Sequence, residues 1–500
     1  MEFVSTRDAD GRLPAVSAAE AIKNGLAPDG GLYMPRRIPT LSRHDFDALI
    51  SMDYAERAAD ILGRFLTDYT AEELLEDCRA AYAEERFPGG AAPVVSIGDG
   101  ICALELWHGP TCAFKDMALQ IMPRLLSRAL QKTGETRRAM ILVATSGDTG
   151  KAALEGYRDI PQIGIQVFYP VDGVSRVQKL QMVTQEGDNL TVTAIRGNFD
   201  DAQTGVKRIF SDREFEAQLN RQGVFLSSAN SINWGRLAPQ ISYYVSAYCD
   251  MVKQGTLSFG EPLDVCVPTG NFGNIFAAYI AKRMGTPIGR LVCASNRNDV
   301  LTEFLATGVY NRNRDFYTTI SPSMDILISS NLERLLYLMC GPAETSEYMR
   351  SLNTTGCYRL SAETHKRISS EFYGISCAEE QTAATIAETF EKHGYLCDTH
   401  TAVGLFAARR YPRSAGRPVL LASTASPYKF AMDVCRALGY AAGDPLEALD
   451  LLSDRTGLPI PAPLRGIGER AVRFTETIAP ADMKDSVLRF TDRLESTEKA

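Results

Sequence analysis

Residues 101–120 read ICALELWHGPTCAFKDMALQ, an apolar run followed by a loop that turns into a helix. A short apolar run of this kind predicts a strand buried on both faces, and the loop after it places Lys115 between Phe114 and Met117. Partial burial disfavours the charged form of a lysine, so an amine placed here is a candidate nucleophile that could form a Schiff base with a carbonyl. The alternative is an ordinary helix lysine whose stem lies along the surface.

Apolar strand runs recur along the chain, with helical segments between most of them. They are AMILVAT, IGIQVFYP, LTVTAI, LDVCVP, RLVCAS and PVLLAS. Alternating strands and helices of this length predict an α/β architecture with parallel sheets. Ligands of such sheets bind beyond the carboxyl ends of the strands, so the loops that follow the strands are where chemistry is expected.

Residues 1–95 carry mainly helical patterns, and Thr70 followed by Glu73 predicts a capping box for one of these helices. We therefore expect a small, mainly helical N-terminal domain over residues 1–95. A catalytic region of two α/β lobes is expected over residues 96–480, followed by a C-terminal tail over residues 481–500.

The loop TSGDTGKAALEG, residues 145–156, follows the strand AMILVA and opens a helix. Backbone N–H groups at a helix start favour a carboxylate or a phosphate. Gly150 and Lys151 resemble the end of a nucleotide-binding P-loop, but Thr145 stands where that motif needs Gly, and Ala152 stands where it needs Ser or Thr. A simple turn with a helix cap is the other interpretation.

The loop PTGNFGN, residues 268–274, follows the strand LDVCV. Gly270 and Gly273 can adopt backbone angles that let several N–H groups converge on one anion, and the following helix adds its dipole. This pattern resembles a phosphate cup, although a tight connection would explain it nearly as well.

The segment SSANSINWGR, residues 227–236, places Asn230, Asn233 and Arg236 ahead of an apolar helix. The planar fork of an arginine can grip a phosphate or a carboxylate. The alternative is a polar loop with a helix cap and one exposed arginine.

Composition narrows the function classes. The charge balance of 53 basic against 61 acidic residues is −8, which argues against a general nucleic-acid or membrane-surface role. The 11 cysteines are scattered without a C-x-x-C pair, and we expect reduced thiols in a cytoplasmic protein. The five histidines show no metal-ligand spacing, so no metal is expected.

The succession of loops is more specific than any one of them: HGPTCAFKDMA, ATSGDTG, SSANSINWGR, PTGNFGN, DTHTAVG and STASPYKF. Together with the N-terminal STRD and NGLAPDGGLYMP, this order resembles the threonine synthase family of fold-type II pyridoxal-phosphate enzymes over nearly the whole chain. The resemblance implies an α/β fold like that of the tryptophan synthase β subunit. One departure is Ser426, where many relatives have His.

The resemblance also implies roles for individual residues. Lys115 would hold pyridoxal 5′-phosphate covalently and later move protons. The cofactor phosphate would lie among Gly270, Asn271, Phe272, Gly273 and Asn274, while Thr424 would face the pyridine nitrogen and Asp148 the ring oxygen. The substrate carboxylate would bind at Ser146, Gly147 and Thr149, and the substrate phosphate at Asn230 and Arg236.

The implied reaction converts O-phospho-L-homoserine and water to L-threonine and phosphate, by γ-elimination and addition of water at Cβ. One rival is a related pyridoxal-phosphate lyase that releases a 2-oxo acid. The other is a non-catalytic binding relative that kept the fold, which the presence of Lys115 and the glycine turn disfavours.

Overall fold

The apolar runs of the chain form two sheets, both of which are mainly parallel. The computed structural model describes residues 1–145, 147–171 and 174–499. The larger sheet has the order β13-β10-β9-β14-β4-β3, and only its edge strand β3 runs antiparallel to its neighbour. The smaller sheet has the order β15-β7-β6-β5-β8 and is parallel throughout. The predicted fold of two parallel-sheet α/β lobes is therefore confirmed, and all seven expected strands form.

The strands of the two sheets have these bounds. The larger sheet contains β3 (Val94–Gly98), β4 (Ile101–Glu105), β9 (Leu263–Pro268), β10 (Ile288–Ser295), β13 (Phe372–Ser376) and β14 (Val419–Ser423). The smaller sheet contains β5 (Arg138–Ala144), β6 (Ile163–Pro170), β7 (Leu190–Ile195), β8 (Val224–Ser227) and β15 (Thr477–Ile478). Two short antiparallel pairs are separate from both sheets, namely β1 (Phe3–Ser5) with β2 (Tyr33–Pro35) and β11 (Val309–Asn311) with β12 (Cys357–Arg359).

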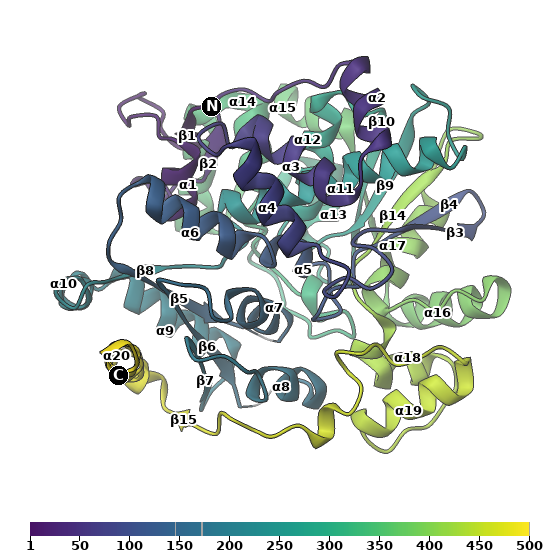
Figure 1. Cartoon of the computed structure of the whole chain (residues 1–500). Coiled ribbons are helices and arrows are strands. Elements are labelled where there is room, and N and C mark those ends of the chain that lie inside the picture. The colour runs from purple at the N-terminus through teal and green to yellow at the C-terminus, as the bar shows by residue number, and fades with distance from the viewer. Residues whose placement is uncertain (146, 172–173, 500) are drawn as a thin grey trace.

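Helices cover the sheets and join the lobes. Those packed on the larger sheet include α12 (Gly273–Met284), α13 (Val300–Thr307), α15 (Ala362–Glu371) and α17 (Thr399–Arg410), and those packed on the smaller sheet include α7 (Asp148–Tyr157), α9 (Phe199–Ser211), α10 (Arg213–Arg221) and α20 (Met483–Lys499). The short helix α5 (Asp116–Leu119) contacts α6 (Met122–Lys132), α7 and α11 (Trp234–Lys253). Figure 1 shows α5 near the centre of the molecule, between the two groups of strands.

The N-terminal region is mainly helical, as expected, and contains α1 (Ala18–Asn24), α2 (Arg43–Ser51), α3 (Tyr54–Phe65) and α4 (Ala71–Ala81). Thr70 and Glu73 form the predicted capping box at the start of α4. A continuous helical pattern over residues 44–66 divides into α2 and α3, because Asp53 adopts an extended backbone and caps α3. This region packs directly on the two α/β lobes through contacts of α3 with α11 and of α1 with α6.

The remaining helices lie in the second half of the chain. They are α8 (Arg176–Val183), α14 (Leu332–Thr355), α16 (Glu379–His393), α18 (Ala431–Ala437) and α19 (Pro445–Thr456), with the 3-10 turns η1 (Pro322–Met324), η2 (Pro427–Phe430), η3 (Ile467–Glu469) and η4 (Pro480–Asp482). Within the described residues, no helix combines the length and the apolar character that crossing a bilayer requires.

The segment expected as a C-terminal tail is mostly the helix α20, and it buries Met483, Val487, Phe490 and Leu494 in the apolar cluster that covers β5 and β6. Gln166 on β6 donates a hydrogen bond of 2.7 Å to Ser486, which adds a polar contact to this packing. The end of the chain is thus part of the lobe that contains β5 to β8.

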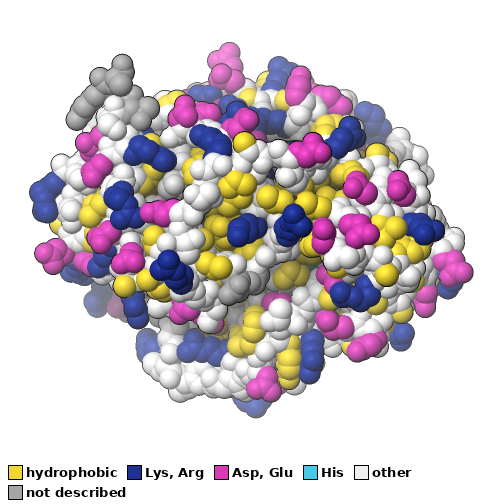
Figure 2. All heavy atoms as spheres, turned by 90° about the horizontal axis from the view of Figure 1, so that it is seen from below, with side chains coloured by type: hydrophobic (Ala, Val, Ile, Leu, Met, Phe, Trp, Pro, Cys, Tyr) yellow, Lys and Arg dark blue, Asp and Glu magenta, His cyan; other side chains and the backbone are white. Residues whose placement is uncertain are grey.

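Charged side chains are spread rather than gathered on the face that Figure 2 shows. Basic and acidic groups alternate over that face, with hydrophobic side chains between them. The mixture of charges on this face agrees with the modest net charge of −8.

Candidate active site

Lys115 lies between the two lobes, immediately before α5. The loop that carries it is fixed to the end of β14, because the N–H of Phe114 donates to the carbonyl of Thr424 at 2.8 Å. The Nζ atom of Lys115 lies 3.4 Å from the Oγ atom of Ser323 and 3.7 Å from an oxygen of Asp148. Only 13% of the side chain is exposed, so the amine lies inside the protein with few partners.

The surroundings of Lys115 favour its neutral form. Burial lowers the pKa of Lys115; Asp148 opposes that shift, and the positive charges of Lys429 and Arg236 add to it. Burial alone would raise the pKa of Asp148, but Lys429 and Lys115 hold it well below its usual range. The site therefore contains a carboxylate that stays charged beside an amine whose pKa is lowered.

The glycine-rich turn after β9 lies close to Lys115 through Ser323. A Cβ atom on Gly270 would come within 2.6 Å of the carbonyl oxygen of Ser323, whose hydroxyl is the neighbour of the Lys115 amine. Phe272 has a left-handed backbone with φ of 62° and packs its ring on Phe372 at 5.6 Å. Lys115 and the turn, far apart in sequence, thus face one site.

Several donors in this turn are free. None of the hydrogen bonds recorded for the described residues uses the N–H groups of Asn271, Phe272, Gly273 or Asn274 at the start of α12. The side-chain oxygen of Asn274 accepts from Tyr243 at 2.6 Å and from Tyr244 at 2.5 Å, whereas its buried Nδ2 has no partner. An unpartnered buried amide is costly, and an anion held by this group and the four N–H groups would remove that cost.

The loop after β5 brings a second set of free donors to the site. Gly147 has φ of 141°, and a Cβ atom there would lie 2.5 Å from Gln178, so glycine is required. The N–H groups of Asp148 and Thr149 at the start of α7 are used by none of the recorded bonds, while Asp148 directs its carboxylate to Lys429 and Gln178. The predicted substrate contact at Ser146 lies outside the described residues.

Arg236 is a buried cation without a buried anion. It lies in the first turn of α11, donates to the carbonyl of Ala229, and leaves its Nε without a partner. No acidic side chain among the described residues pairs with it, and burial lowers the pKa of Arg236 to about 10. A guanidinium in this state is suited to an incoming phosphate or carboxylate.

The two asparagines of the same segment behave differently from Arg236. Asn233 caps α11 by accepting from the N–H of Gly235 and donates to the carbonyl of Ile22, which is the structural alternative considered for this segment. Asn230 lies on the exposed loop, where its side chain accepts a bond of 3.3 Å from Ser231. Its predicted contact with a substrate phosphate remains a prediction.

Thr424 and Ser426 occupy the turn between β14 and η2. Thr424 is buried and its carbonyl accepts from the N–H of Phe114, the residue before Lys115, while no hydrogen bond among the described residues uses its hydroxyl. Ser426 caps η2 through a bond from the N–H of Tyr428, and its own N–H donates to Cys112. The residue that departs from the family pattern is thus used in holding the loop of Lys115.

Four residues of the site were not predicted from the sequence: Ser323, Asp398, His400 and Lys429. His400 accepts the N–H of Ser323 at 3.1 Å, and Asp398 holds the other ring nitrogen at 2.7 Å, so this pair fixes the residue that touches Lys115. Lys429 binds Asp148 at 2.8 Å. Asp398 and His400 lie in the polar loop DTHTAVG, and Lys429 lies in the polar loop STASPYKF, so these loops were the only indication in the sequence. Nothing in the sequence around Ser323 indicated a role for that residue.

The residues present fit a cofactor with an aldehyde at one end and a phosphate at the other. The amine of Lys115 suits the aldehyde, and the turn at 270–274 with the free Nδ2 of Asn274 suits the phosphate. Pyridoxal 5′-phosphate, expected from the sequence, has both groups.

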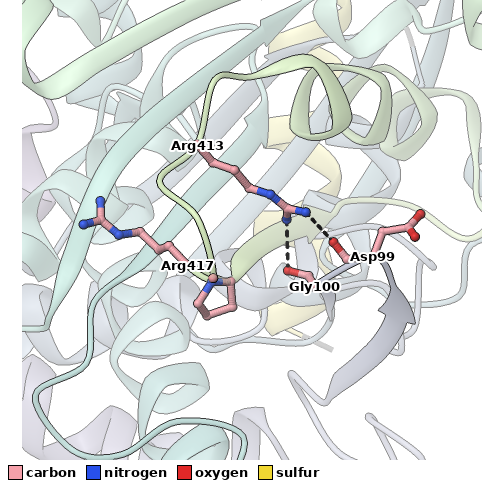
Figure 3. Close-up of a pocket in the computed structure, with 6 residues that line it drawn as sticks. Asp99, Gly100, Arg413 and Arg417 are labelled. Atoms are coloured by element: carbon pink, nitrogen blue, oxygen red, sulfur yellow. Dashed lines mark hydrogen bonds between the residues drawn. The ribbon is translucent and has the colours of Figure 1, made fainter.

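A separate hollow of about 440 Å³ lies at the opposite edge of the larger sheet, where β4 and β14 begin. Figure 3 shows Arg413 donating there to the carbonyls of Asp99 and Gly100, and Arg417 pairs with Asp264 at 3.2 Å. Both guanidinium groups already have partners, and the carboxyl ends of the strands face the other way. This hollow is not part of the candidate active site.

Three family models match the chain in succession. Threonine synthase N terminus matches residues 2–82, pyridoxal-phosphate dependent enzyme matches residues 92–424, and threonine synthase C-terminal matches residues 401–486. The second match alone spans both lobes, and it contains Lys115 and the turn at 270–274.

Individual relatives agree with these models. Threonine synthase from Pseudomonas aeruginosa is 39% identical over 463 residues, which is 90% of this chain and 93% of that protein. Human threonine synthase-like 1 is 42% identical over 453 residues, which is 87% of this chain but 60% of that longer protein. The crystal structure of threonine synthase from Brucella melitensis with bound pyridoxal phosphate has a TM-score of 0.88 at 37% identity, covering 98% of this chain and 99% of that one.

Proposed function

Since the chain belongs to the threonine synthase family of pyridoxal-phosphate-dependent enzymes, we propose that it converts O-phospho-L-homoserine and water to L-threonine and phosphate. One observation carries the proposal: Lys115 and the 270–274 turn meet through Ser323. A nucleophilic amine next to an anion cradle is the arrangement that a phosphorylated aldehyde cofactor needs.

Each part of the site has a role in holding the cofactor. Pyridoxal 5′-phosphate, when bound, supplies a ring that withdraws electrons and so stabilises negative charge on the Cα atom of an amino acid. Lys115 would hold its aldehyde carbon, and the N–H groups of residues 271–274 with the amide of Asn274 would hold its phosphate. The free hydroxyl of Thr424 is proposed for the ring nitrogen, and Asp148 for the side of the ring oxygen.

Lys115 is proposed as the group that moves protons. Once the substrate amine has replaced it at the aldehyde carbon, the Lys115 amine would accept the proton of the substrate Cα, release it, and then accept the Cβ proton whose loss lets phosphate leave from Cγ. Burial lowers the pKa of this amine, which suits a group that takes up and releases protons. A single tethered base next to both carbon atoms gains from its fixed position. Return of one proton to Cγ and one to Cα, with addition of the hydroxyl group of water at Cβ, then completes threonine, and the remaining proton of the water goes to the released phosphate.

The charged ends of the substrate match the free donors. Arg236, a buried guanidinium with no acidic partner among the described residues, is proposed to bind the phosphate. The free N–H groups at the start of α7, at Asp148 and Thr149, with the Gly147 backbone between them and β5, are proposed to bind the carboxylate. Asn230 is kept as a weaker candidate because its loop is exposed.

The experiment that tests the proposal is incubation of the purified chain, with pyridoxal 5′-phosphate, in O-phospho-L-homoserine. Equal amounts of L-threonine and phosphate are expected. A 2-oxo acid as the main product would instead identify a lyase of the same fold, and a protein that stays colourless with added cofactor and yields no product would identify a binding relative. The free thiols of all 11 cysteines support a reducing, cytoplasmic setting for this activity.

A further inference from the structure

A second buried lysine, Lys429, lies beside the candidate active site. It belongs to η2, and its side chain is fully buried. Its Nζ atom lies 2.8 Å from an oxygen of Asp148, 2.8 Å from the carbonyl oxygen of Thr111, and 3.3 Å from the Oε1 atom of Gln181. A lysine ammonium has three N–H donors, so the three acceptors can use all of them.

Asp148 is shared between the two lysines. One carboxylate oxygen accepts from Lys429 and, at 2.9 Å, from the Nε2 atom of Gln178, while the other oxygen lies 3.7 Å from Lys115. One buried negative charge can compensate only one buried positive charge. Lys429 lies closer to Asp148 than Lys115 does and has two further hydrogen-bond acceptors. A positive charge on Lys115 would therefore be the one that Asp148 does not compensate.

The other acidic groups around Lys115 are directed to partners other than its amine. Asp116, its chain neighbour, accepts from the backbone and hydroxyl of Thr111, and Glu155 on α7 pairs with Lys151. Arg236 on α11 adds positive charge, and His400 on α17 reaches Lys115 only through Ser323, whose N–H it accepts. The balance of charge therefore depends on how Asp148 divides between two amines.

We propose that Lys429 is a positioning residue that occupies Asp148 and thereby keeps the amine of Lys115 unprotonated and ready to react with the cofactor aldehyde near neutral pH. The inference rests on the proposed function, because it takes Lys115 as the residue that holds the cofactor. Without Lys429, Asp148 would be free to pair with Lys115 and hold a proton there.

The pH dependence of cofactor capture tests the inference. The full-length chain, freed of cofactor, is mixed with pyridoxal 5′-phosphate between pH 6 and pH 9, and the rate at which visible absorbance appears is measured. In Lys429→Met the midpoint of this profile is expected to move up by about one pH unit, which makes capture about tenfold slower at a fixed pH below the midpoint. Lys429→Gln, which keeps polar contacts without the charge, should show the same shift and replaces the methionine variant if that chain does not fold.

Matched variants separate charge from packing. Lys429→Arg keeps the positive charge and should keep the wild-type midpoint. The double variant Lys429→Met with Asp148→Asn removes both charges and should return the midpoint to the wild-type value or below it. A merely structural role for Lys429 would lower folding yield or stability without moving the midpoint.

Two failures are distinguishable. If the wild-type chain captures no cofactor at any pH, the proposed function itself is wrong. If the wild-type chain captures cofactor and both neutral variants give the same midpoint as wild type, the proposed function stands and the role of Lys429 is overturned.

Discussion

Three buried cations near the site differ in what compensates them. Lys429 has a carboxylate and two further acceptors, Lys115 has a carboxylate at 3.7 Å that is already shared, and Arg236 has only a carbonyl. Because an uncompensated charge inside a protein is costly, the last two positions mark where chemistry and anion binding are expected. Lys115 and Arg236 therefore each lead to a testable prediction about a single residue.

Replacing Lys115 should remove covalent attachment of the cofactor. Lys115→Ala is expected to lack the visible absorbance that borohydride abolishes in the wild-type protein, and turnover should fall to background. Lys253→Ala, which changes an exposed lysine on α11, should keep both. If Lys115→Ala retains the absorbance, another lysine holds the cofactor.

Replacing Arg236 should weaken substrate binding. Arg236→Gln removes the charge of a buried donor, and a charge-assisted hydrogen bond contributes about 1.5–3 kcal/mol, so KM for phosphohomoserine should rise by roughly tenfold to a hundredfold. Steady-state kinetics measure the change. Arg413→Gln, at the opposite edge of the sheet, should leave KM unaltered, and equal KM values for all three proteins would remove Arg236 from the site.

Asp116 should give the stability of the protein a distinctive pH dependence. Burial raises the pKa of Asp116 to about 6, against the bonds from Thr111 that favour its charged form. Between about pH 4 and pH 6 the folded state keeps a proton that the unfolded chain has released, so this group lowers the free energy of unfolding by up to roughly 3 kcal/mol as pH rises.

Asp116→Asn removes that titration. The free energy of unfolding of the variant, minus that of wild type, is therefore expected to increase from pH 4 to pH 6 and to stay level above pH 6. Urea unfolding at several pH values measures this difference. Asp47→Asn, on the exposed side of α2, should give a difference that does not change over the same window, and parallel profiles for Asp116→Asn and wild type would contradict the assignment.

Sequence alone could identify only part of this site. Lys115 and the glycines at 270 and 273 stand at loop-to-helix junctions, which a reader of the sequence can locate. Lys429, His400 and Ser323 belong to the site because of their contacts with residues far away in the sequence. Ser323 and His400 are 77 residues apart, and Lys429 and Thr111 are 318 residues apart. No local pattern records a contact of that kind.

Elements, in contrast, were largely predictable when they were long and apolar. All seven strands expected from continuous apolar runs are present, since buried parallel strands need such runs. The short strands β1, β2, β11 and β12 have three residues each and are defined by their partners rather than by composition. The break between α2 and α3 depends on the cap at Asp53, which the periodicity of apolar residues does not reveal.

The close approach of the β9–α12 turn to η1 gives a prediction at this scale. Gly270→Ala would place a methyl group 2.6 Å from the carbonyl of Ser323, so the two segments must separate. Overpacking of this kind costs about 1–3 kcal/mol, and cofactor affinity measured by titration of the apoprotein should fall about tenfold. Gly63→Ala on α3, where the new Cβ meets only Leu74 at 3.5 Å, should leave affinity unchanged; an unaltered affinity in Gly270→Ala would mean that the turn does not hold the cofactor.

At the scale of the whole molecule, the N-terminal region is joined to the catalytic lobes by a buried acid. Glu333, at the start of α14, accepts from Thr6 and from Arg7, and its side chain is 4% exposed. Next to it, Arg334 is fully buried and donates to the carbonyls of Tyr33 and Ile232 and to Asn331, which in turn contacts the 270–274 turn. The N-terminal region thus supports the turn at 270–274.

Removing that acid should loosen the N-terminal region. Glu333→Gln leaves Arg7 without its partner and is expected to cost about 2–3 kcal/mol, with faster hydrogen exchange in residues 1–35. Glu2→Gln, which breaks the exposed pair with Arg36, should cost less than about 1 kcal/mol. If both variants exchange and unfold alike, Glu333 does not join the two regions.

The last helix has a consequence for how the protein is made. Gln166 on β6 bonds to Ser486 on α20, 320 residues further along, and α20 completes the cover that α9 and α10 begin over the apolar face of that sheet. A nascent chain emerging from the ribosome must therefore leave part of that apolar face open to chaperones until residues 483–499 have been made.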